Sequence, residues 1–218
     1  MNTLKKVLEG FKPGSEAELD EWFKGLAEAF LYGGYISVSD YKEERYRIFI
    51  RTVEFYCHYE GEDAKDMPKD PIVYHRNGRY VEGEVPYFPL MSFHAHASGY
   101  DITFENQDLQ LRSSALIRAY EVYDVVRQTF LHYDRVKKLF VSCNDTKDRV
   151  NKQSTYLYNF LNGFSDNNIK WIDAIRDKSD GIKAAPRQNV YLYDEDENKL
   201  PEKDTRKWSF TRQEEIRD

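Results

Sequence analysis

The densest set of residues that could do chemistry lies between Ser92 and Tyr120. Its two histidines, His94 and His96, are separated by one residue, so on an extended chain both imidazoles point to the same face. Imidazole nitrogens combined with carboxylate oxygens suit iron, manganese or zinc, which makes a metal site one hypothesis for this segment. The candidate partners are Asp101, Glu105, His75 and His58. The alternative is that both histidines are hydrogen-bonded pocket or core residues, because short motifs of this kind also arise by chance.

The same segment contains the apolar run Ala115–Ala119, which is typical of a strand and carries one guanidinium, Arg118. A nearly buried arginine normally has an acidic partner. Glu54 lies among apolar and aromatic neighbours, where desolvation would make it a better general base. The alternative is that Glu54 forms a structural ion pair with a nearby arginine. The candidates for that pair are Arg47, Arg51 and Arg118.

Aromatic side chains make up 15% of the chain, and several of them flank the histidine segment. Stacked rings could hold a planar ligand such as a nucleobase, whereas the alternative is that they fill the core. The rings in question are Tyr56, Tyr74, Tyr87, Phe88, Phe93 and Tyr100.

These residues need a scaffold, and hydrophobic periodicity predicts its first elements. A helix is expected from Ser15 to Tyr32, begun by a capping box between Ser15 and Glu18 and ended by Gly33-Gly34. Strands are expected at 35–38 and 46–59. Strict alternation in the second strand places Ile48, Ile50, Thr52, Glu54, Tyr56 and His58 on one face, and Phe49, Val53, Phe55 and Cys57 on the other. Both faces of this strand should therefore be covered.

The rest of the chain reads as alternating short elements. We expect a charged loop at 60–71, an extended piece at 72–75, a turn at 76–79, and a half-buried strand in which Asp101, Thr103 and Glu105 alternate with Ile102 and Phe104. Helices are expected at 120–140 and 155–164 and a strand at 189–193. From about residue 194 the tail is charged, and its anchor is the run 207–210. The prediction is one α+β domain over residues 1–218, with strands dominating the middle.

Composition limits the classes of function. Charged residues are 32% of the 218, the mean hydropathy is -0.78 and the net charge is -6, which favours a soluble protein and argues mildly against tight nucleic-acid binding. Cys57 and Cys143 give neither a disulfide framework nor a zinc spacing. No stretch reads as a signal peptide or a membrane span, so we expect a cytoplasmic protein without a membrane partner. No cofactor is expected.

Six short motifs, in this order along the chain, are shared with one family. Residues 27–33 resemble an A-x-x-L-L-G helix end, residues 53–58 a V-E-T-E-A-Y strand, and residues 97–101 a pocket segment. Residues 116–119 match L-I-R-A, residues 186–190 resemble P-R-x-G-V, and residues 208–210 resemble an aromatic R-F piece. In these motifs the chain resembles the methylpurine (3-methyladenine) DNA glycosylases, as a diverged relative.

The resemblance implies a single α+β domain with a curved, mostly antiparallel sheet. It also implies hydrolysis of the N-glycosidic bond of a modified purine in duplex DNA, as in base excision repair. The family's catalytic acid falls on Tyr56, and Glu54 matches the preceding acid, about 7 Å further along the strand. The family's stacking tyrosine falls on His58 and its pocket asparagine on Glu105 or Asn106, while Arg118 is retained.

Two functions follow from this reading, beside the metal hypothesis. In the first, Glu54 is the catalytic base of a glycosylase-type hydrolase and Arg118 positions the base or a phosphate. In the second, the scaffold has lost its chemistry and binds a nucleobase-like or other small polar ligand. The candidate pocket residues are Tyr56, His58, His75, Phe93, His94, His96, Tyr100, Glu105 and Arg118.

Overall fold

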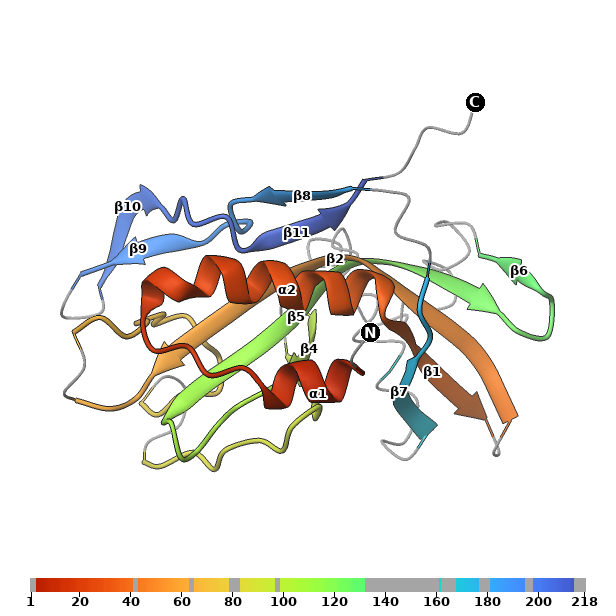
Figure 1. Ribbon diagram of the computed structural model, residues 1–218, viewed down its shortest axis with the longest axis horizontal. Helices are drawn as coiled ribbons and strands as arrows, with labels where there is room; N and C mark the ends of the chain where they lie inside the picture. The colour runs from red at the N-terminus through yellow and green to blue at the C-terminus, as the bar shows by residue number, and fades with distance from the viewer. Residues whose placement is uncertain are drawn as a thin grey trace, which may run out of the picture.

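A computed structural model describes most of the chain. The described residues are 3–40, 43–62, 65–78, 83–96, 99–131, 161, 168–176, 181–194 and 198–213, and of Ala95 and His96 the backbone alone is described. Over these ranges the protein is a mixed α+β fold in which a few helices pack on one curled antiparallel sheet (Figure 1). This confirms the predicted fold class at the level of α+β with a curved sheet.

The N-terminal region is helical. It consists of α1 (Leu4–Glu9), the 3-10 turn η1 (Glu16–Glu18) and α2 (Leu19–Tyr32), which lies across the sheet against its longest strand (Figure 1). The predicted helix is confirmed, but the predicted capping box is wrong. The Ser15 side chain makes no capping bond, and the Glu18 carboxylate accepts from the Gly14 N–H at 2.9 Å instead. The helix ends at Gly33, as predicted.

The described strands pair antiparallel throughout. They are β1 (Gly34–Asp40), β2 (Glu43–Tyr59), β3 (Phe93–His96), β4 (Gly99–Thr103), β5 (Leu111–Asp124), β6 (Thr129–Phe130), β7 (Ile169–Asp173), β8 (Ile182–Ala185), β9 (Tyr191–Tyr193), β10 (Lys199–Lys203) and β11 (Ser209–Arg212). Within the described ranges, the main sheet runs β3-β4-β5-β2-β1-β7, with β6 on β5 and with β11 between β2 and β8. Strands β9 and β10 form a separate two-stranded sheet.

The long strand β2 changes neighbour halfway along, while β5 follows its other edge. Residues near its start pair with β1, and residues 52–54 pair with β11. At this change the register with β5 shifts twice, and the Cα register skips Arg51 of β2 and Arg118 of β5. An extra residue in a strand reverses which side chains face the core. The core therefore contains Ile48 and Ile50 before the shift and Val53, Phe55 and Cys57 after it.

This reversal corrects the predicted alternation. Ile48 and Ile50 do not share a face with Glu54, Tyr56 and His58, because the bulge separates the two groups. The second half of β2 is nevertheless covered on both faces, as predicted, since residues 53–58 are all buried.

Three further predictions are corrected and one lies outside the described residues. The helix predicted at 120–140 is wrong over its described part, where β5 continues to Asp124 and a turn leads to β6; residues 132–140 are not described. Residues 72–75 form turns, not an extended piece. The strand predicted from Asn189 begins at Tyr191, because Asn189 has a φ of 58°. The helix predicted at 155–164 lies outside the described residues except for Leu161.

The C-terminal anchor is confirmed. Trp208 is 1% exposed, and it leads into β11, whose Phe210 joins the core. In the described part of the chain, no helix is long and apolar enough to cross a membrane.

Aromatic rings dominate the core between α2 and the sheet, and Phe55 lies at their centre. Its ring centroid is 4.9 Å from that of Phe23, 5.8 Å from Phe30, 6.3 Å from Phe104 and 5.7 Å from Phe210. The Phe55 ring thus packs against α2, against Phe104 just after β4 and against Phe210 of β11.

We predict that Phe55→Ala lowers the free energy of unfolding by roughly 3–5 kcal/mol, because it leaves a cavity among these rings. Phe55→Leu, which retains most of the volume, should cost clearly less. Urea unfolding followed by fluorescence measures both, with Val126→Ala, at a residue 67% exposed, as the surface control. A loss for Phe55→Ala no larger than that of the control would contradict this assignment.

Candidate functional site

The face of the sheet turned away from α2 carries a layer of polar side chains from β2, β4 and β5. Cross-strand pairing places His94, Asp101, Leu116 and Glu54 in one row. We call this the polar face and define it by Glu54, Tyr56, His58, His94, Asp101, Thr103, Arg112, Ser114, Leu116 and Arg118. Loops cover it, since Val73 and Val190 pack against Tyr56 and Leu116 in a small second core.

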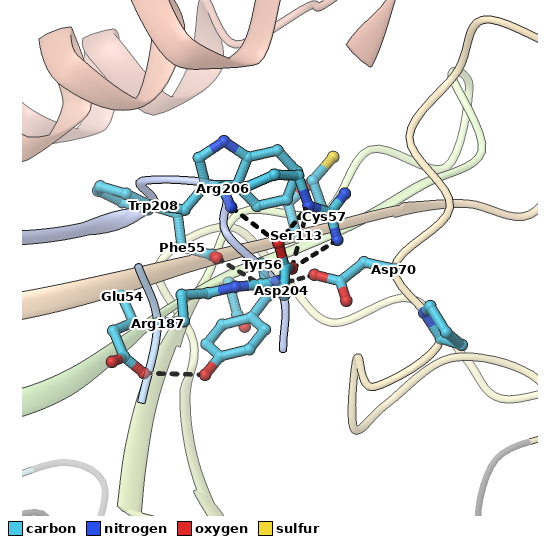
Figure 2. A network of polar contacts seen from close by, with 12 residues as sticks. Glu54, Phe55, Tyr56, Cys57, Asp70, Ser113, Arg187, Asp204, Arg206 and Trp208 are labelled. Carbon is cyan, nitrogen blue, oxygen red and sulfur yellow. Dashed lines mark hydrogen bonds and ion pairs between the residues drawn. The ribbon is translucent and has the colours of Figure 1, made fainter. Parts of the chain in front are cut away.

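Glu54 is the centre of the polar face. Its side chain is 0% exposed, and three protein groups donate to its carboxylate. Oε2 accepts from Arg118 Nε at 2.6 Å and from the Tyr56 hydroxyl at 3.0 Å, while Oε1 accepts from the Gln188 N–H at 2.9 Å (Figure 2 shows the bond to Tyr56). The ion pair with Arg118, weighed above as the alternative to a general base, is present.

Arg118 reaches Glu54 from the bulge in β5. Bulges re-aim side chains, and here the extra residue turns its guanidinium onto the polar face. The side chain is 15% exposed, so it lies at the rim of the layer. Burial acts to lower the pKa of Arg118, but Tyr56 and Glu54 outweigh burial and raise it. Burial and the Glu54 charge raise the pKa of Tyr56, which therefore remains a hydrogen-bond donor.

A second arginine, Arg187, is wholly enclosed beside this group (Figure 2). Its guanidinium lies 4.6 Å from the Tyr56 ring centroid and 4.9 Å from that of Trp208. It contacts Asp70 and Asp204 at 2.5 Å each and donates to the Phe55 carbonyl at 3.2 Å. Arg187 thereby holds the loops that carry Asp70 and Asp204 against β2 at Phe55.

The Asp204 carboxylate also accepts a hydrogen bond from Arg206. The Arg206 guanidinium in turn contacts the Glu16 carboxylate at 3.0 Å, which extends the network. Burial acts to raise the pKa of Asp204, but hydrogen bonds from Arg206 and the charge of Arg187 lower it to about 2. The carboxylate therefore stays ionised and keeps both arginines.

A third buried arginine, Arg112, holds the loop that precedes β3. It contacts Glu105 at 3.0 Å and Glu60 at 3.1 Å, and it lies 3.6 Å from the Tyr87 ring centroid. Glu105 also contacts His75 Nδ1 and accepts from the Phe88 N–H at 2.6 Å. Glu105 is thus occupied by protein groups within this third centre.

His58 lies on the polar face beside Arg112, its register partner, and is 7% exposed. Burial, followed by the positive charges of Arg76 and Lys69, lowers its pKa to about 4. Its imidazole is therefore neutral at pH 7.

The sequence-predicted site residues fall into separate groups. Glu54, Tyr56 and Arg118 form one, and His75, His94 and Glu105 lie together in another, with the two imidazole centroids 5.9 Å apart. Phe93 and Tyr100 are not brought to either group, because they pack against the main core. The side chain of His96 lies outside the described part. Among the described side chains, no group of three or more His, Cys, Asp or Glu could hold a metal ion.

The sequence reasoning missed Arg112 and Arg187 as members of the site. Arg112 could have been found, because it alternates with Ser114 and Leu116 toward the face that Arg118 also uses. Arg187 carries no such local signal, since Asp70 lies 117 residues away and Asp204 lies 17 residues away, outside the strand or helix period around Arg187.

Comparison with family models, with curated protein sequences and with solved structures finds no match to this chain. The resemblance to methylpurine DNA glycosylases therefore stays a hypothesis that depends on the motifs quoted above.

We predict that Arg187→Met lowers the free energy of unfolding by roughly 3–5 kcal/mol, because it leaves the buried Asp70 and Asp204 without their counter-charge. Arg187→Lys should cost somewhat less, since it keeps the charge but not the planar fork. The control is Lys24→Met, whose ion pair with Glu21 is exposed on both sides (66% and 85%), and it should cost about 1 kcal/mol or less. Equal losses for the two Met variants in urea unfolding would contradict the role given to Arg187.

His58 should make stability depend on pH. Its folded pKa of about 4 lies below the ordinary 6.5, so the unfolded chain binds this proton first as the pH falls. The stabilisation is complete above pH 6.5 and is lost between pH 6.5 and 4, by at most about 3 kcal/mol. Urea titrations across this range should show a flatter pH dependence for His58→Gln than for the wild type. Parallel curves would show that His58 is not the group responsible.

Proposed function

We propose that this protein is a non-hydrolytic binding module, and that the rim of the polar face at Arg118 holds a small planar polar ligand of the nucleobase type. The observation that carries the proposal is the state of Glu54. Its carboxylate is 0% exposed and takes three protein donors, whereas Arg118 keeps part of its side chain exposed. A general base must reach the proton that it removes within about 3 Å or through one water, and here protein donors surround both oxygens.

The same ion pair prepares Arg118 for recognition. Glu54 takes the Nε–H, and a guanidinium has four further N–H donors on its two Nη atoms. A guanidinium held in place by a carboxylate loses little conformational freedom on binding. Its paired donors match two adjacent acceptors on a planar base, as between arginine and the O6/N7 edge of guanine.

The neighbouring strand supplies an acid near this donor. Asp101 of β4 pairs with Leu116, which lies two residues before Arg118 on β5. Asp101 lies in the adjacent row and its carboxylate accepts from Ser114 at 3.1 Å. The polar face thus offers a donor at its rim and, one row away, a buried acceptor that is 3% exposed, and a base edge with a carbonyl and an amino group requires both.

Hydrolysis of a modified purine nucleoside bond in DNA is the second candidate function. It is favoured by the presence of Glu54 and Arg118 in the matched motifs and by their direct contact. For this reaction Glu54 would have to exchange one of its present donors for water.

Calorimetric titration with hypoxanthine, adenine and 7-methylguanine tests the binding function. We expect at least one base to bind, and Arg118→Met to weaken that binding about tenfold or more, because a hydrogen bond to a charged group is lost. Arg127→Met, at an exposed arginine elsewhere, should leave the affinity unchanged. Binding that is indifferent to Arg118→Met, or no binding by the wild type at millimolar base, would contradict the proposal.

Measuring base release from alkylated duplex DNA tests the second candidate function, hydrolysis. We expect no base release above the protein-free control. Release that is abolished by Glu54→Gln would replace the binding function with the hydrolase.

A further inference from the structure

The other half of the face turned away from α2 is built differently from the polar face. Before the bulge, the outward side chains of β1, β2, β5 and β6 include several aromatic rings and arginines. We call this the aromatic–arginine surface and define it by Tyr35, Arg47, Phe49, Arg51, Tyr123, Phe130 and Arg176. Nothing in the proposed function uses it.

Its rings form a continuous row across four strands. The centroid of Phe49 is 5.4 Å from that of Tyr35 and 5.9 Å from that of Phe130, and Phe130 lies 5.2 Å from Tyr123. Phe130 is 49% exposed, and the other three rings are partly exposed. Cross-strand rings stabilise a sheet by their mutual contact, but this does not require a half-exposed phenylalanine.

Arginines are interleaved with this row. The guanidinium of Arg47 lies 5.2 Å from the Tyr35 ring centroid, and that of Arg176 lies 4.1 Å from the Phe49 centroid. Arg51 approaches Glu121 at 3.5 Å on the same face, and Arg47 contacts Glu44 at 2.7 Å. The exposed Lys170 lies one strand beyond, opposite Ser37. Four basic residues thus accompany two acidic ones here, in a chain whose net charge is -6.

We propose that the aromatic–arginine surface binds single-stranded nucleic acid, with bases stacked on the rings and phosphates held by the arginines. Every base has a flat face that can stack on an aromatic ring, and an open sheet with exposed rings suits bases that are splayed from a strand. A duplex keeps its bases stacked inside, so it cannot offer them to this surface. The acidic Glu44 and Glu121 oppose phosphate and should keep the affinity moderate and sensitive to salt.

Fluorescence anisotropy with a labelled oligothymidine at low salt tests this surface. We expect Phe130→Ala to weaken binding about fivefold or more, the loss of one stacked base. Glu121→Gln should strengthen binding, because it removes a negative charge beside Arg51. If this surface served only to stabilise the fold, Glu121→Gln would not raise the affinity for the oligonucleotide.

The matched control is Tyr191→Ala, which removes a partly exposed ring that also carries a cation, Lys199 at 3.7 Å, but on the separate β9–β10 sheet. It should leave the affinity unchanged. Thermal unfolding of each variant confirms that it is folded.

Four results would overturn the inference. These are no binding at roughly 100 µM protein in low salt, equal binding of a duplex of the same length, an equal loss in Tyr191→Ala, and wild-type self-association that Phe130→Ala abolishes. The last result would assign the surface to a second copy of the chain.

Discussion

A carboxylate that is removed from water must have its charge and its lone pairs met by protein groups, and Glu54 imposes this requirement on the polar face. Its three donors come from the same strand, from the bulge of β5 and from the loop at Gln188. Losing any of them would leave a buried charge poorly compensated, so the three segments are held in one arrangement. Arg187 extends this arrangement by fixing the loops of Asp70 and Asp204 behind Tyr56.

The paired bulges explain why one face of the sheet carries two kinds of surface. Arg51 and Arg118 are the extra residues of β2 and β5, at the place where β2 exchanges β1 for β11. On one side of these bulges lies the aromatic–arginine surface. On the other side lies the polar face, whose charged side chains are buried, ion-paired and covered by loops. Arg118 lies at the boundary, which is why it is both paired and partly exposed. Position on the sheet, more than residue type, thus decides which charged groups are available to a ligand.

Local patterns in the sequence were sufficient for the main helix, for β1 and β2, and for the expectation that Arg118 has an acidic partner. They failed at the bulge, because strict alternation does not hold across an extra residue: the core positions change there from Ile48 and Ile50 to Val53, Phe55 and Cys57. They failed again at 120–124, where apolar residues at mixed spacing suited a helix but pairing with β2 makes them a strand. The contact of Arg187 with Asp70 could not be predicted from local patterns, because the two residues lie 117 positions apart.

The central claim is that Glu54 serves as the structural acceptor of Arg118. A double-mutant cycle on the free energy of unfolding, with Glu54→Gln, Arg118→Met and the double variant, tests it most directly. The account predicts that each single variant is destabilised and that the double variant loses less than the two losses combined, with a coupling of about 1–3 kcal/mol. Losses that add to within about 0.5 kcal/mol would contradict it, because the two side chains would then act independently.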